Sequence, residues 1–175
     1  MITTVFDFGD FNSQGVCHAI CGQWIKKSRA IVRWGGGGGV TSLSELGDKM
    51  FLKRVWDEAD DTKHINRNNL LGHPLKTVNI SASGGTLNTM VAARELTLGY
   101  NQYYLLIIDF ADSSRHALAA KRMRMPGGLQ FLDPNDSCWQ YDNSFEMYEH
   151  IRDHIADNYG DLSITESEIS TYSPG

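Results

Sequence analysis

The stretch GVCHAICGQWI, residues 15–25, decides the fold, because it predicts where the first helix begins and which side chain stands there. After Gly15 the apolar positions recur at helical spacing. A free cysteine is most often a buried apolar side chain. In the first turn of a helix, however, unpaired backbone N–H groups and the aligned peptide dipoles favour the thiolate, the nucleophilic form. Cys17 is therefore a candidate nucleophile.

The composition is that of one globular domain over residues 1–175, with 41% hydrophobic side chains and a net charge of −5. This acidity argues against a nucleic-acid partner, and the one basic cluster, AAKRMRM at 119–125, has the spacing of a solvated strand face. No stretch reaches the ~20 apolar residues of a membrane span, and the acidic start MITTVFDFGD is unlike a Sec signal peptide. We expect a monomer.

The cysteines and histidines do not form a metal-binding or disulfide pattern. Cys17, Cys21 and Cys138 are odd in number, which fits a reducing compartment or a free reactive thiol. Cys21, one turn after Cys17, is predicted to pack in the core, and the two lack the second ligand pair of a zinc site. His150 and His154 share a helix face but lack the Glu of an HExxH frame. We expect no metal and no cofactor.

The rest of the chain predicts an α+β domain, with helices first and an antiparallel sheet after them. Apolar spacing predicts helices over 44–58, 87–99 and 144–159. Apolar runs separated by the tight turns DSSR and MPGG predict an antiparallel meander of strands at 103–110, 116–123 and 128–133. The glycine run 35–39 and the polar segment 60–74 are expected to be loops. Residues 160–175 are expected to be frayed or a loose final strand.

A thiolate nucleophile needs a base, and the base needs a group that orients it. His116 opens the second strand of the meander and Asp133 closes the third, so the two side chains are predicted to be neighbours. Asp136 and Asp142 compete for the orienting role but fit the geometry of the strand pair less well. Nothing in the spacing itself places Cys17 beside these residues.

The developing oxyanion of acyl transfer is usually stabilised by a backbone N–H at the nucleophile and by a side-chain amide. Asn12 and Gln14 both precede Cys17 closely enough to supply that amide. Asn12 is preferred, because Gln14 lies so near the helix start that its side chain can cap the helix.

Three patches of the chain resemble the YopT-like family of papain-like cysteine peptidases, bacterial effectors that include YopT and AvrPphB. GVCHAICGQWI is similar to the family's nucleophile helix, which Gly-x-Cys opens and in which a Trp follows the Cys seven positions later. HALAAKR and GLQFLDPNDSCW resemble its His strand and its Asp-Pro-Asn stretch, in the same chain order. The resemblance covers residues 12–28, 114–122 and 127–140.

The resemblance implies a papain-like fold, in which the nucleophile helix packs on a central antiparallel sheet. It implies Cys17 as nucleophile, His116 as general base and acid, Asp133 as its orienting carboxylate and Asn12 as oxyanion-hole donor. Family members are injected into host cells, where they cut host proteins such as small GTPases or kinases. This chain has almost nothing ahead of Asn12, so we expect a leader to be absent or removed, and its middle segment has no match.

Two other functions remain open from the sequence. A related group of papain-like effectors uses Cys-His-Asp to deamidate a glutamine of a host protein, because the same thiolate attacks a side-chain carbonyl instead of a peptide carbonyl. The second is a binding domain in which the three residues have no catalytic part. The substrate is not defined by any of these patterns.

Overall fold

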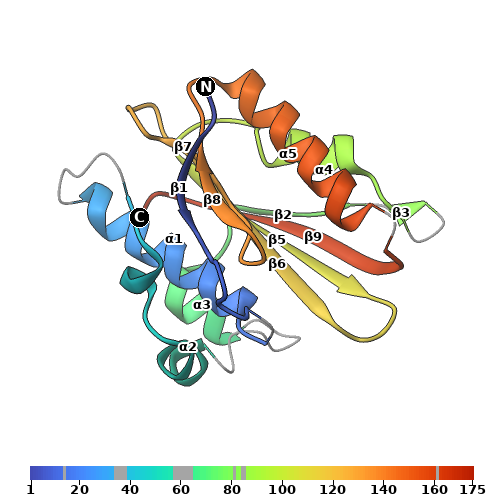
Figure 1. Ribbon diagram of the computed structural model, residues 1–175, viewed down its shortest axis with the longest axis horizontal. Helices are drawn as coiled ribbons and strands as arrows, with labels where there is room; N and C mark the ends of the chain where they lie inside the picture. Colours follow the sequence, from blue (N-terminus) through green and yellow to red (C-terminus); the bar gives the residue numbers. More distant parts are fainter. Residues whose placement is uncertain (14, 34–38, 57–64, 81, 84–85, 161) are drawn as a thin grey trace.

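The computed structural model describes residues 1–13, 15–33, 39–56, 65–80, 82–83, 86–160 and 162–175. In this part of the chain, an antiparallel sheet of seven strands runs through the middle, in the order β1-β8-β7-β6-β5-β9-β2 (Figure 1). Its strands are β1 (Thr3–Asp7), β2 (Lys76–Asn79), β5 (Gln102–Phe110), β6 (Arg115–Arg122), β7 (Leu129–Leu132), β8 (Ser137–Gln140) and β9 (Ile164–Tyr172). The fold class is α+β, as predicted.

Helices cover both faces of this sheet and enclose two apolar clusters (Figure 1). One face carries α1 (Cys17–Arg33), the 3-10 turn η1 (Leu43–Leu46), α2 (Lys49–Trp56) and α3 (Ile65–Leu71). The other carries α4 (Thr89–Glu95) and α5 (Ser144–Tyr159). A separate two-stranded ribbon consists of β3 (Ala82–Ser83) and β4 (Thr86–Leu87).

The predicted meander is present as β5, β6 and β7, which pair in succession. Its register places Ile108 opposite His116 and Ala119 opposite Leu132. Strands β8 and β1 extend the sheet beyond β7, and β9 and β2 extend it beyond β5. The meander therefore lies at the centre of the sheet, and the ends of its strands carry His116 and Asp133.

The C-terminal segment forms the final strand that was one of its two predicted states, but the strand is neither frayed nor loose, because β9 is an inner strand that pairs with β5 along its whole length and with β2 on its other side. Its glutamates give the segment a polar appearance, whereas its second half is almost entirely buried. The guanidinium of Arg29 in α1 donates to the carbonyl of Ser173 at 2.7 and 3.0 Å, which fixes the end of the chain to the first helix.

Helix boundaries differ from the prediction in the middle of the chain. The helix expected over 44–58 divides into η1 and α2 at Gly47, whose φ of 96° no right-handed helix accommodates. The segment expected to be a loop over 60–74 contains α3. The helix expected over 87–99 is shorter, because the side chain of Asn88 caps its start at Val91 N. The expected glycine loop lies outside the described residues except for Gly39.

The basic cluster at 119–125 is not a solvated strand face. Lys121, Arg122 and Met123 are all buried, because β6 lies between β5 and β7 and helices cover both faces of the sheet. The guanidinium of Arg122 donates to the carbonyl oxygen of Gly99 at 2.7 Å and to Ser144 Oγ at 3.1 Å. Burial of these charges was not predictable from a short basic run.

Helix α1 is held in one orientation by its packing against α2. A Cβ atom at Gly22 would lie 2.4 Å from the Trp56 ring, so the glycine allows the two helices to approach closely. The indole N–H of Trp56 donates to Gln23 Oε1 at 3.1 Å. Cys21 and Trp24 are fully buried, as expected for the core, and burial raises the pKa of the Cys21 thiol well above its usual value.

Candidate active site

Cys17 is the first residue of α1, and its side chain faces the start of β6. The turn before it is closed by hydrogen bonds from Val16 N to Ser13 O at 2.9 Å and from Ile20 N to Val16 O at 2.8 Å. The Cys17 thiol donates to the carbonyl oxygen of Arg115 at 3.6 Å. The sulfur therefore lies where the helix dipole is positive and beside the residue that precedes His116.

His116 contacts both Cys17 and Asp133. Its Nε2 lies 2.9 Å from Asp133 Oδ1, as the strand geometry predicted, and the interaction of its ring with Cys17 contributes to the raised pKa of the imidazole. Because Nε2 is directed at the carboxylate, Nδ1 is the ring nitrogen that remains for the sulfur. Sulfur, imidazole and carboxylate thus lie in sequence, which is the order that proton transfer from a thiol requires.

The loop between β1 and α1 is tied to the turn that carries Asp133, and this explains how Cys17 reaches His116. Phe8 N donates to Asp136 O at 3.0 Å, and Ser13 Oγ donates to Asn135 Oδ1 at 2.7 Å. Both bonds follow from the pairing of β1 with β8, the strand that begins directly after this turn. The sequence did not predict β1 or β8, and so it could not place the sulfur.

The electrostatics of His116 favour its charged form. Burial by itself lowers the pKa of the imidazole, but the hydrogen bonds to Asp133 and Cys17 outweigh it and raise the pKa to about 9. A charged imidazolium stabilises a neighbouring thiolate. The raised pKa of His116 therefore places a positive charge beside the Cys17 side chain.

Asp133 stays ionised although it is buried. Burial alone would raise the pKa of this carboxyl, but hydrogen bonds from His116 and His154 outweigh it, and the pKa lies well below its usual range. His154 Nε2 lies 2.7 Å from Asp133 Oδ2, and Tyr159 OH donates to the same oxygen at 2.7 Å. Asn135 N donates to Oδ1 at 2.8 Å. The carboxylate thus keeps its charge for the imidazole.

The site is shielded from bulk water. Cys17, His116 and Asp133 expose 7%, 6% and 1% of their surfaces. The Tyr159 ring stacks on the His116 ring, with centroids 5.2 Å apart and planes 29° apart. Interactions among charges are stronger in such an environment than in water. The ring of Tyr159 also restricts how far the imidazole can turn.

The competing carboxylates bind elsewhere. Asp136 Oδ1 accepts a hydrogen bond from Ser137 Oγ at 3.0 Å, and Asp142 Oδ2 accepts one from the N-terminal ammonium group at 2.7 Å. Asn12 lies exposed in the loop before α1, where its backbone carbonyl accepts a hydrogen bond from Lys49 Nζ at 3.3 Å. Its role as oxyanion-hole donor stays a prediction. Gln14 lies outside the described residues.

Four residues around Cys17, His116 and Asp133 were not found from the sequence: His154, Tyr159, Asn135 and Ser13. One signal was present, since His154 lies on the same face of α5 as Ile151 and Ile155, the face that packs on the sheet. A histidine on a buried apolar face needs a polar partner. His154 was considered only as a metal ligand, whereas its partner is Asp133.

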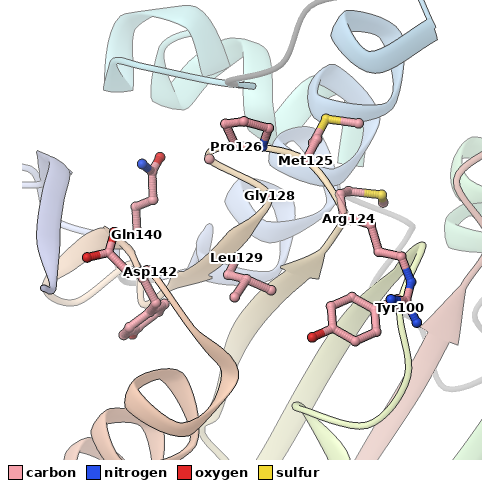
Figure 2. A pocket seen from close by; sticks show the side chains of 11 residues that line it. Tyr100, Arg124, Met125, Pro126, Gly128, Leu129, Gln140 and Asp142 are labelled. Atoms are coloured by element: carbon pink, nitrogen blue, oxygen red, sulfur yellow. The ribbon is translucent and has the colours of Figure 1, made fainter.

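A cavity of about 480 Å³ lies at the opposite end of β6 and β7 from this site (Figure 2). Its walls come from the turn between these strands, from the residues that end β8, and from Tyr100. Arg124 lies over the ring of Tyr100, 4.1 Å from its centroid. Because eight residues of β6 span ~25 Å, this cavity does not open onto Cys17.

The described residues contain no group of three or more His, Cys, Asp and Glu side chains that could hold a metal ion. His150 Nδ1 forms a hydrogen bond with Tyr141 OH at 2.5 Å, and His154 is directed at Asp133, so the two rings do not share a ligand position. In the same part of the chain, no helix is both long enough and apolar enough to cross a membrane.

A helix that begins at a cysteine and packs on an antiparallel sheet that carries His and Asp defines a papain-like fold. The structure is similar to the crystal structure of the Pseudomonas avirulence protein AvrPphB, with a TM-score of 0.57 over 90% of this chain and 91% of that chain. The two sequences are 15% identical, so the likeness shows the fold, which is the one that the family resemblance implied. No family model and no curated protein matches the sequence.

Proposed function

We propose that this protein is a cysteine hydrolase that cleaves a peptide bond of a host protein. The observation that carries the proposal is the position of His116: its Nε2 lies 2.9 Å from the buried carboxylate of Asp133, and the Cys17 thiol donates to the carbonyl oxygen of the preceding residue, Arg115. In this proposal Cys17 is the nucleophile, His116 is the general base and acid, and Asp133 orients His116. Asn12 supplies a donor for the oxyanion.

The proposed reaction uses these residues in two steps. The Cys17 thiolate forms a bond to the carbonyl carbon, and the C–N bond breaks as His116 donates its proton to the departing amine. A water molecule then attacks the thioester while His116 accepts its proton. This releases the acid and restores the thiolate and the imidazolium. Asp133 keeps the imidazole in the orientation that both steps need.

The fold shared with AvrPphB, an avirulence protein, supports a role as a bacterial effector. We propose that a specialised secretion system delivers the protein and that it acts in the host cytoplasm on a protein such as a small GTPase or a kinase. The net charge of −5 favours a basic surface on that partner through long-range attraction that salt would weaken.

The test is the rate at which iodoacetamide alkylates Cys17 between pH 5 and pH 9, with the modified residue located by mass spectrometry. An activated thiol still reacts at pH 6, whereas the rate of an ordinary thiol falls about tenfold per pH unit below ~8.5. Cys21 and Cys138 are fully buried and should stay unlabelled in the folded protein. His116→Ala should restore the profile of an ordinary thiol. An ordinary profile in the unaltered protein would overturn the proposal.

Cleavage and deamidation differ in the products. In a host-cell extract, cleavage gives two fragments of one protein, and Cys17→Ala should abolish both fragments without loss of the fold. A single intact protein with one peptide shifted by about one dalton would instead identify a glutamine deamidase on the same triad. If neither product forms and alkylation is ordinary, a binding domain remains.

A further inference from the structure

The carboxylate of Asp133 is saturated with hydrogen-bond donors, and one of them is a second histidine. Within the described residues, Oδ1 accepts from His116 Nε2 and Asn135 N, and Oδ2 accepts from His154 Nε2 and Tyr159 OH. These bonds occupy about as many positions as the lone pairs of a carboxylate provide. Orienting His116 through Oδ1 therefore requires that Oδ2 be held as well.

The hydrogen bonds of His154 indicate which nitrogen carries its proton. Asn158 Nδ2 donates to the backbone carbonyl oxygen of His154 at 2.8 Å, and this fixes which end of the amide carries nitrogen. The same nitrogen lies 3.3 Å from His154 Nδ1, so Nδ1 acts as the acceptor. Nε2 is then the nitrogen that donates to Asp133.

The ring of His154 is also held by packing. The ring of Trp139 in β8 packs edge to face against the ring of His154, with centroids 4.9 Å apart. The ring of Phe131 in β7 packs in the same way, with centroids 5.7 Å apart. The ring of His150, one turn earlier on α5, lies 6.0 Å away and is bound to Tyr141. The contacts with Trp139 and Phe131 fix the ring of His154, so its Nε2–H group reaches Asp133 from a rigid element, and His150 is not needed for this.

We propose that His154 is a positioning residue for the reaction at Cys17, and that its Nε2–H group fixes the Asp133 carboxylate by a hydrogen bond to Oδ2. The carboxylate then presents Oδ1 to His116 in one orientation. This inference rests on the proposed triad, and it assigns to α5 a part in the site that the triad alone does not contain.

The experiment compares the pH profile of Cys17 alkylation in four variants of the full chain. His154→Leu should lower the rate at pH 6 by about 10-fold to 100-fold, the range expected from loss of one hydrogen bond to a charged group. In His154→Gln the amide N–H reaches the position of Nε2, so the rate of Cys17 alkylation at pH 6 should stay within about threefold of that of the unaltered protein. His154→Asn, whose amide is too short to reach Asp133, should resemble His154→Leu. His150→Leu, the matched control, should have no effect.

The outcomes separate this inference from the proposed function. An ordinary thiol profile in the unaltered protein overturns the triad itself. An activated profile that His154→Leu leaves unchanged overturns the role of His154 alone. Equal rates in the Gln and Asn variants mean that the side chain only fills space, and they overturn the inference even if the Leu variant does not fold.

Discussion

Two basic side chains of β6 are almost fully buried, yet their pKa values move in opposite directions. His116 lies at the start of the strand and its pKa is raised to about 9, because hydrogen bonds to Asp133 and Cys17 outweigh burial. Lys121 lies five residues later and its pKa is lowered to about 8, because burial dominates. Burial alone thus lowers the pKa of a base, and the carboxylate of Asp133 reverses that effect for His116.

The substitution that breaks this contrast is Asp133→Asn. Without the carboxylate, burial lowers the pKa of His116 and the imidazole loses the partner that fixes its tautomer. The hydrolysis rate should fall by about 10⁴-fold, the loss measured when the equivalent carboxylate of a serine-protease triad becomes an amide. NMR titration of His116 should show a pKa far below 9.

Asp136→Asn is the control for that variant, because Asp136 lies in the same turn but its carboxylate binds Ser137. It should keep both the rate and the titration of His116. A severe loss in Asp136→Asn combined with a mild one in Asp133→Asn would transfer the orienting role to Asp136.

The second prediction concerns Lys121, the other buried basic side chain in this comparison. Lys121→Met should raise the free energy of unfolding at pH 7 by roughly 1–3 kcal/mol, because a buried ammonium group is replaced by an apolar chain of similar length. Alkylation of Cys17 should not change. Urea unfolding gives the free energy, and a variant less stable than the original chain would show that Lys121 stabilises the fold.

The pH dependence of stability gives the sign of each contribution. The pKa of His116 in the folded protein lies above the unfolded value of 6.5. Its contribution to the free energy of unfolding is therefore complete below pH 6.5 and is lost as the pH rises to about 9. For Lys121 the folded pKa lies below the unfolded value of 10.5. Lys121 therefore lowers the free energy of unfolding most below pH 8, and this effect disappears as the pH rises. Urea unfolding between pH 6 and pH 10 isolates Lys121 when the two chains are compared: the gain in free energy of unfolding from Lys121→Met should be largest below pH 8 and should shrink as the pH rises.

The same pair of side chains shows what the sequence could predict. The meander and the neighbouring positions of His116 and Asp133 follow from strand alternation and short turns, which are local properties. The burial of Lys121 depends on the position of β6 between β5 and β7 and on helices that cover both faces of the sheet, and no local pattern contains the position of those helices. Placement of Cys17 depends on β1, a short strand that pairs with a partner more than 130 residues away.

His154 illustrates a different limit. Its spacing from His150 indicated that both rings lie on one side of α5, and spacing alone suggested a shared metal. The partner that gives His154 its role comes from the turn after β7, and the sequence contains no signal for that contact. A buried polar group could be expected to have a partner, but which one it has is a property of the packing.

The smallest expected effect belongs to Tyr159→Phe, which removes one donor from Oδ2 but keeps the ring that stacks on His116. A water molecule can take the place of the hydroxyl, so alkylation of Cys17 should slow only about threefold to tenfold. The carboxylate remains charged, and the pH profile should therefore keep its shape, in contrast to Asp133→Asn. A Tyr159→Phe profile that moves toward that of an ordinary thiol would show that the raised pKa of His116 depends on every donor around Asp133, and not on its charge alone.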